Sequence, residues 1–342
     1  MNKWYKDDKC NEGIIISSRV RLARNLKKYN FYNKLSSDDA LKMIQDVKSS
    51  LLDSRTVFGQ QFEYIPINTM NDNEKFSLVE KHVISPELMR NNKPCGVLVK
   101  DDETISIMLN EEDHIRIQAI SPGDNIDEAF DLADKIDNLI EESVEYAFSE
   151  KYGYLTSCPT NVGTGLRASY MMHLPQLEKT GQMRSLVQAI AKFGITVRGI
   201  YGEGSDAMGC IYQVSNQVTL GQSEHDIIDN LKRVAAIIVK REIELENNAY
   251  KSAPDDIEDK IWRSYGILKA ARKITGKEAM QLISNIMEGK NMGVSDIPKF
   301  NIQPVELMIN IQPASIQVSQ NTDMTPLERD RYRAEYIRNI IG

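Results

Sequence analysis

Strand-like and helix-like segments are mixed along roughly the first 250 residues of the chain, whereas the sequence beyond them looks helical. The two patterns meet at a polar stretch, 247–256, that contains Pro254. The length of 342 residues also exceeds the ~250–300 at which a single core usually stops growing. We therefore expect two domains, 1–250 and 251–342, the second of them helical.

The strand-like segments predict antiparallel pairing. Residues 96–100 and 105–109 are apolar runs on either side of the turn 101–103, and 114–120 continues as a further strand. Ile14–Ile16 has the composition of a short buried strand. The expected fold class is α+β, with a mainly antiparallel sheet flanked by helices and followed by a helical domain.

Helical spacing and capping signals mark several helices. A helix is expected from about 36 to 52, and a long amphipathic one follows 121–123, with apolar positions from Ile126 to Ala147. Capping boxes begin three more helices, at Ser223–Asp226, Thr275–Glu278 and Thr325–Glu328.

Adjacent carboxylates at the start of a strand are the most unusual local feature. Glu111 and Glu112 precede a strand in which Ile115, Ile117 and Ala119 face one side, while His114, Arg116 and Gln118 face the other. Such a charged face backed by an apolar one suggests a sheet that lines a cleft. A solvated strand with acidic turn residues explains the same pattern.

Arginines recur in similar settings. Arg19 and Arg21 follow a buried strand, and Arg167 and Arg198 lie in glycine-containing segments. Guanidinium groups match phosphate oxygens, so several that converged would hold a triphosphate. Taken singly, each arginine is more often a surface residue, and spacing alone does not bring them together. Neither a phosphate-binding loop nor a dinucleotide fingerprint is present.

Composition excludes several classes of function. The net charge of −7 argues against a general nucleic-acid binder, which needs a basic face. No apolar run approaches the ~18 residues that span a bilayer, and the start of the sequence lacks a signal peptide. The four cysteines, Cys10, Cys95, Cys158 and Cys210, are widely spaced, so we expect neither a disulfide framework nor a thiolate metal site, and a cytoplasmic location.

Two segments make a resemblance specific. Residues 110–116 (NEEDHIR) and 158–167 (CPTNVGTGLR) resemble signatures of the phosphagen (guanidino) kinases, and most of the chain is similar to the bacterial protein arginine kinases within that superfamily. The resemblance implies transfer of the γ-phosphoryl of MgATP to a guanidinium nitrogen. Only 18 residues precede Arg19, so the helical amino-terminal domain of phosphagen kinases is expected to be missing. A site without that domain suits an arginine on a protein surface.

The resemblance also implies roles for single residues. Glu112 would accept the proton of the guanidinium, with Glu111 beside it. Glu203 would grip the guanidinium from the loop 199–207, and Cys158 would be an auxiliary thiol. The implied ATP-phosphate arginines are Arg19, Arg21, Arg116, Arg167 and Arg198. Further implied nucleotide contacts are Ser18, Val20, Leu22, His82, Ala168, Ser169, Tyr170, Met171, Gly199, Ile200, Tyr201 and Gly202.

A second cationic set lies near the end of the chain. Arg329 and Arg333 share a helix face at i, i+4 spacing and are able to clamp a phosphate, while Asp330 is able to pair with a guanidinium. The set resembles the RDxxRA phosphoarginine motif of protein arginine kinases, which implies an allosteric recognition site. A solvated charged helix face is the alternative.

The family further implies partners and a setting. Phosphorylation would mark proteins with exposed arginines for a Clp protease system and inactivate a heat-shock repressor, as part of a stress response. A zinc-binding activator protein and a homodimer are also implied. Two other functions remain open: a kinase for a small guanidine, or a weakly catalytic adaptor that reads phosphoarginine.

Overall fold

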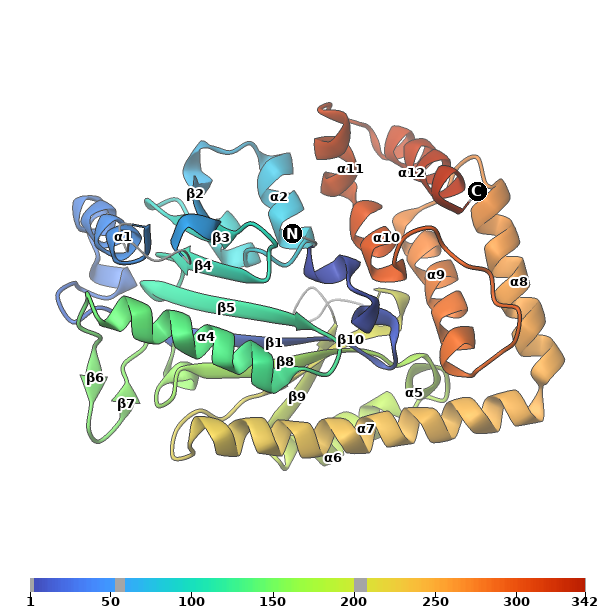
Figure 1. Cartoon of the computed structure of the whole chain (residues 1–342), viewed down its shortest axis with the longest axis horizontal. Helices are drawn as coiled ribbons and strands as arrows, with labels where there is room; N and C mark the ends of the chain where they lie inside the picture. Colours follow the sequence, from blue (N-terminus) through green and yellow to red (C-terminus); the bar gives the residue numbers. More distant parts are fainter. Residues whose placement is uncertain (1–2, 53–58, 200–207, 342) are drawn as a thin grey trace.

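The structure, a computed structural model, describes residues 3–52, 59–199 and 208–341 and is built around one twisted antiparallel sheet (Figure 1). Every neighbouring pair in the sheet is antiparallel. The strands, in spatial order, are β2 (Phe62–Pro66), β3 (Gly96–Lys100), β4 (Ile105–Leu109), β5 (Ile115–Pro122), β1 (Ile15–Arg24), β8 (Leu166–His173), β10 (Ile211–Asn216) and β9 (Ile195–Gly199). A separate hairpin pairs β6 (Phe148–Ser149) with β7 (Gly153–Tyr154).

The helices fall into two groups. Those that accompany the sheet are α1 (Ser37–Leu52), α2 (Asp72–Glu80), α3 (Pro86–Met89), α4 (Ile126–Glu141), α5 (Pro175–Lys179), α6 (Met183–Ala191) and α7 (Glu224–Ser252). Those that follow are α8 (Pro254–Ala270), α9 (Gly276–Asn291), α10 (Pro304–Asn310), α11 (Pro313–Gln320) and α12 (Pro326–Ile341). Figure 1 shows the second group beside the sheet, with α7 running beneath both parts.

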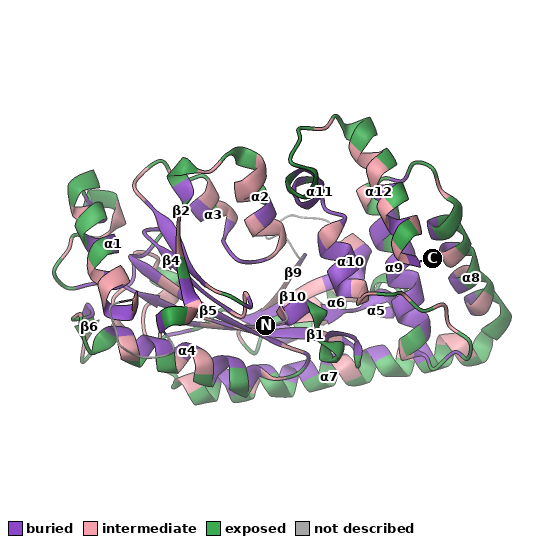
Figure 2. Cartoon of the chain, turned by 45° about the horizontal axis from the view of Figure 1, so that its top comes forward, coloured by how far each residue is buried: buried purple, intermediate pink, exposed green. Residues whose placement is uncertain are grey.

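One face of the sheet is apolar and covered. Its side chains, Val20, Leu22, Ile115 and Ile117 among them, pack with the inner faces of α4 and α7 in a single core. Figure 2 shows the buried strands enclosed by helices whose outer faces are exposed. Because successive side chains of a strand point to opposite faces, the intervening arginines of β1 and β5 must lie on the other face.

The helical group packs against one end of that second face. Ile120 and Ile211 of the sheet share a core with buried residues of α8, α9, α10 and α12, and with Trp4 and Cys10 from two short 3₁₀ helices, η1 (Trp4–Lys6) and η2 (Asp8–Asn11). Each fully buried isoleucine stabilises such a core by about 1.5–3 kcal/mol. The start of the chain therefore joins the sheet to the helical group.

The predicted fold class, α+β with a mainly antiparallel sheet and a carboxy-terminal helical region, is confirmed. The strands at 96–100 and 105–109 and the cap of α7 by Ser223 and Asp226 are confirmed as well. The helix expected to extend to Ala147 is shorter in the structure, where α4 ends at Glu141. The strand expected at Ile14–Ile16 extends to Arg24. Along the described ranges, no helix combines the length and apolar character that crossing a membrane requires.

Candidate active site

Arginine side chains form a row across the second face of the sheet. In the strand register, Gln118 of β5 lies opposite Arg21 of β1, and Arg21 lies opposite Arg167 of β8. Arg19 lies two residues before Arg21 and therefore on the same face, and Arg198 of β9 is opposite Gln213 of β10. Together with Arg116, these arginines line a cavity of about 660 Å³.

The row concentrates positive charge at a cost to the fold. Burial and the neighbouring guanidinium groups of Arg167 and Arg116 lower the pKa of Arg19 to about 10. Burial, followed by the charges of Arg19 and the other neighbouring arginines, lowers the pKa of Arg21 well below its usual value. The Nε of Arg21 has no hydrogen-bond partner among the described residues. Like charges directly opposite each other are unfavourable, so this cavity favours an anion.

An acidic turn borders the arginine row between β4 and β5. Asn110 begins it with φ of 59°, a left-handed conformation that asparagine tolerates better than most residues. Glu111 is buried, and its Oε1 accepts a hydrogen bond from Nη1 of Arg116 at 2.5 Å and one from the hydroxyl of Ser85. Its Oε2 has no partner within the described residues.

Glu112 lies next to the thiol of Cys158. The two side chains form a hydrogen bond, and the Sγ of Cys158 lies 3.0 Å from the Oγ1 of Thr160. Both residues line a small recess of about 90 Å³ together with Arg116. Burial and the charge of Asp113 raise the pKa of Glu112, while Arg116 lowers it. A carboxylate with a raised pKa is a stronger base.

Sequence reasoning missed a buried hydrogen-bond network around Asp113, here called the brace, that holds the chain next to Glu112 and Cys158. One carboxylate oxygen of Asp113 accepts hydrogen bonds from Nδ2 of Asn25 (2.7 Å) and from the backbone N–H of Ser157 (2.6 Å). Asn25 in turn accepts from the backbone N–H of His114 at 2.9 Å. The brace thus fixes the residues adjacent to Glu112 and Cys158. The sequence signal was present, because Asp113 belongs to the acidic run, but its partners are distant in the chain.

Residues 79–87, which link α2 to α3, form one wall of the larger cavity. Val79, His82 and Ser85 all line it. The amide of Gln118 donates to the backbone carbonyl of His82 at 2.7 Å, which ties the wall to the sheet. Burial, with a smaller contribution from Arg19, lowers the pKa of His82 to about 3, so its imidazole is neutral near pH 7.

Other nucleotide contacts expected from the sequence lie elsewhere. The side chains of Val20, Leu22, Ala168 and Tyr170 belong to the apolar core, and the hydroxyl of Ser18 donates to the backbone carbonyl of Gly123 at 2.7 Å. These side chains lie on the covered face of the sheet, opposite the arginine row, because side chains alternate between the two faces along each strand.

The remaining residues that the resemblance implies as site residues lie in different parts of the chain. Ser169 shares the face of the arginine row, and its hydroxyl is 3.4 Å from the carbonyl oxygen of Arg19. Met171 packs against the core of the helical group, and Gly199 lies at the end of β9 beside Arg198. The predicted residues Ile200, Tyr201, Gly202 and Glu203 lie outside the described residues.

The glycines of the segment 158–167 serve close packing. A Cβ at Gly165, which has φ of 65°, would lie 2.6 Å from the carbonyl oxygen of Ala23. A Cβ at Gly163, with φ of 113°, would lie 2.3 Å from the carbonyl oxygen of Thr219. Both contacts are too short for any side chain, so glycine lets this segment lie directly against β1 and the chain after β10.

Arg333 and Arg329 of α12 bind groups within the helical group. Arg333 is buried, and it donates to the carbonyl oxygens of Ile311 (2.9 Å) and Ile274 (3.0 Å) and to the carboxylate of Asp330 (2.6 Å). Arg329 donates to the carbonyl oxygen of Met324 at 2.8 Å. Burial lowers the pKa of Arg333, and Asp330 opposes that effect.

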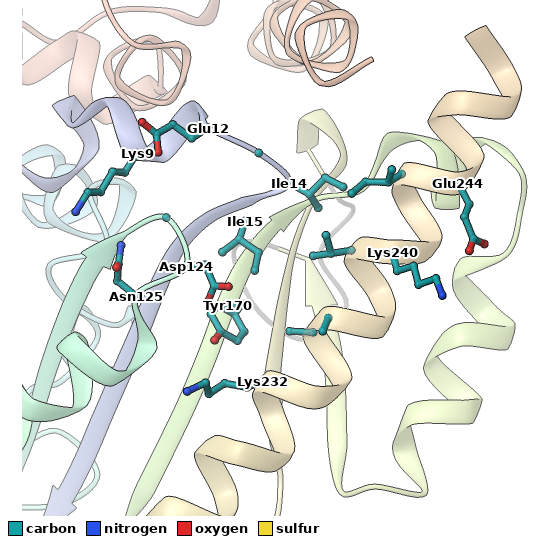
Figure 3. A pocket seen from close by; sticks show the side chains of 16 residues that line it. Lys9, Glu12, Ile14, Ile15, Asp124, Asn125, Tyr170, Lys232, Lys240 and Glu244 are labelled. Atoms are coloured by element: carbon teal, nitrogen blue, oxygen red, sulfur yellow. The ribbon is translucent and has the colours of Figure 1, made fainter. Parts of the chain in front are cut away.

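A second cavity, of about 760 Å³, lies on the covered side of the sheet between β1, β8 and α7 (Figure 3). Tyr170 and Asp124 point into it, with Lys232 of α7 nearby. None of the arginines of the row reaches this cavity. Within the described ranges, no group of three His, Cys, Asp or Glu side chains is placed to hold a metal ion.

Comparison with known proteins identifies the family of this chain. Residues 42–245 match the family described as "ATP:guanido phosphotransferase, C-terminal catalytic domain", and residues 254–342 match "Protein-arginine kinase McsB C-terminal domain". The chain is 46% identical to a protein-arginine kinase of Caldanaerobacter subterraneus, over 96% of both chains. This chain belongs to the protein-arginine kinase family. A protein-arginine kinase of Clostridium kluyveri is 44% identical, over 100% of this chain and 99% of the relative.

Solved structures support the fold of this protein-arginine kinase family member. Lombricine kinase superimposes with a TM-score of 0.60 at 24% identity, covering 75% of this chain and 71% of that one. A duplicated taurocyamine kinase from Schistosoma mansoni, with bound components of a transition state analog, gives a TM-score of 0.61 at 24% identity, over 71% of this chain and 35% of that one. At this identity the likeness shows the fold alone.

Proposed function

We propose that this chain transfers the γ-phosphoryl group of MgATP to arginine side chains of proteins. The observation that carries the proposal is a cavity in which half-buried, mutually repelling arginines face a carboxylate beside a thiol. The arginines match the charge of a nucleotide tail, and the carboxylate matches a guanidinium. Membership of the protein-arginine kinase family supports the same chemistry.

In the proposed reaction, the phosphates of ATP bind along the row formed by Arg19, Arg21, Arg116, Arg167 and Arg198. The adenosine lies toward His82. The acceptor guanidinium occupies the recess beside Glu112 and Cys158. As the N–P bond forms and the bond from phosphorus to the ADP oxygen breaks, Glu112 takes the guanidinium proton. The arginines stabilise the charge of the transferring phosphoryl group.

The described residues fit an ATP phosphate chain, since the Nε of Arg21 has no hydrogen-bond partner among them. Magnesium would neutralise phosphate charge when bound. Glu111, whose Oε2 has no hydrogen-bond partner in the described part of the chain, is the carboxylate that would help to hold the ion.

The remaining expectations extend the proposal. Arg329, Asp330 and Arg333 are proposed to bind phosphoarginine as an allosteric site in a homodimer. Glu203 is proposed to bind the acceptor guanidinium. Clp-dependent degradation, inactivation of a heat-shock repressor and a zinc-binding activator follow from the family resemblance, in a stress response. The four cysteines are free thiols, which suits the reducing cytoplasm.

The decisive experiment incubates the protein with MgATP and an arginine-rich protein. Mass spectrometry should find an acid-labile, base-stable phosphate on arginine. Phosphorylation of free arginine without any protein-bound product would instead select a kinase for a small guanidine. Absence of transfer together with phosphoarginine binding would select an adaptor.

The allosteric part has its own test. Asp330→Ala should spare basal transfer and weaken binding of free phosphoarginine, measured by calorimetry. Asp323→Ala, at a carboxylate outside the motif, is the matched control. Unchanged phosphoarginine binding by Asp330→Ala would remove the allosteric proposal.

A further inference from the structure

Glu80, at the last residue of α2, joins the wall of the anion cavity to the helical group. Its Oε1 accepts from the backbone N–H of Ala314 at 2.9 Å, and its Oε2 accepts from the backbone N–H and the hydroxyl of Ser315 at 2.7 and 2.8 Å. The carboxylate therefore caps the amino terminus of α11, where the orphan amides and helix dipole favour negative charge.

The wall depends on this contact because of its position in the chain. Val79 and His82, on either side of Glu80, line the cavity. His82 has φ of 61°, an uncommon backbone conformation that persists only where the surroundings hold it. Gln118 fixes the carbonyl of His82 from the sheet side, and Glu80 is the charged contact from the helical side.

Arg333 binds the connection between α10 and α11, just before the cap made by Glu80. The Nε of Arg333 donates to the carbonyl oxygen of Ile311, three residues before Ala314. The segment from Ile311 to Ser315 is therefore bound by Arg333 at a carbonyl oxygen and by Glu80 at two backbone N–H groups. The opposite charges of Glu80 and Arg333 also attract each other across it, which opposes the lowering of the Arg333 pKa by burial.

We propose that Glu80 is a positioning residue, through which the helical group sets the wall around His82 and thereby the affinity for ATP. The inference rests on the proposed function, since it takes the cavity to be the nucleotide site. Glu80 does not line that cavity and acts only through α11 and the backbone that follows it.

The test compares two variants of the full-length protein at the same interface. Glu80→Ala removes the cap next to the wall. Asn73→Ala removes a side chain at the start of α2 that also bonds to the helical region, through Gln317 at 3.0 Å and Asp323 at 2.5 Å, but lies a helix length from the wall. Glu80→Ala should raise KM for ATP about fivefold or more, with kcat at saturating ATP within about twofold. Asn73→Ala should leave both unchanged.

Calorimetric titration with MgATP separates this inference from the proposed function. If the wild-type protein binds no MgATP, the proposed function fails. If it binds MgATP but Glu80→Ala binds equally tightly, only the role of Glu80 is wrong. An equal rise of KM for ATP in Glu80→Ala and Asn73→Ala would also overturn the role of Glu80. Weaker docking of the helical group would then explain the rise without the cap. Glu80→Gln retains one acceptor oxygen and should fall between wild type and Glu80→Ala.

Discussion

Glu112 is the single residue on which the proposed chemistry depends most. Glu112→Gln keeps the shape of the side chain but cannot accept a proton, so kcat should fall by about 10²–10⁴-fold. ATP binding should stay within about twofold, because Glu112 faces the acceptor recess. Phosphotransfer assays and MgATP calorimetry on the same preparation make the comparison. Near-normal kcat would contradict the assignment.

The acid limb of the pH profile follows from the same residue. Glu112 must be ionised to accept a proton, and burial together with Asp113 raises its pKa above the usual 4.5. The value of kcat/KM should therefore fall as the pH drops through a point above 4.5. In Glu112→Gln this limb should disappear from whatever activity remains. An unchanged limb in that variant would assign the titration to another group.

The brace of Asn25 and Asp113 gives a second prediction at this scale. Asn25→Ala removes the amide that holds Asp113, so the flanking Glu112 and Cys158 lose their fixed spacing. A misplacement of this kind costs about tenfold or more in kcat, whereas KM for ATP should change little. Steady-state kinetics at saturating protein acceptor would test this. Equal loss of ATP affinity would indicate general damage instead.

At the scale of elements, local signals predicted individual strands and helix starts. The hairpin 96–109 and the capped start of α7 follow from local signals, and both are confirmed. The resemblance implies nucleotide contacts at Val20 and Leu22, and the period of two along β1 places their side chains in the core. Adjacency in the chain is a poor guide to a site on one face of a sheet.

Pairing between distant strands could not be predicted at all from local signals. Arg21 meets Arg167 only because β1 pairs with β8 in one register, and a shift by one residue would move either side chain to the covered face. The same applies to Asp113, whose partners Asn25 and Ser157 come from other parts of the chain. Residue spacing identified the candidate site residues, and strand pairing determines which of them lie close together.

The arginine row predicts a conflict between stability and binding. Because Arg21 is held beside other cations, Arg21→Gln should stabilise the ligand-free protein by about 0.5–2 kcal/mol while weakening MgATP binding. Thermal unfolding with and without MgATP measures both effects. Arg331→Gln removes an exposed arginine of α12 and should change neither. An unfolding temperature lower than that of the wild type for ligand-free Arg21→Gln would show that the arginine row does not destabilise the folded protein.

At the scale of the whole molecule, buried carboxylates lie where α7 meets the helical group. Burial raises the pKa of Glu242 to about 7 and, with the neighbouring Glu242 and Glu288, that of Glu246 to about 8. Glu242 caps α5 by accepting two backbone N–H groups, and Glu288 pairs with Lys260 at 2.7 Å. Glu246 has the least compensation, since its Oε1 has no hydrogen-bond partner among the described residues.

The raised pKa of Glu246 gives a prediction for global stability. Between pH 4.5 and about 8, the folded state binds a proton that the unfolded state releases, so the free energy of unfolding falls as the pH rises through this range. Glu246→Gln is permanently neutral and should unfold at a higher temperature than wild type at pH 8.5, but at the same temperature near pH 5. Glu244→Gln removes an equal charge from the exposed side of α7 and should not alter the pH dependence. If Glu246→Gln and wild type lose stability in parallel up to pH 8.5, Glu246 is already compensated in the folded protein, and the junction between α7 and α9 is not sensitive to its ionisation.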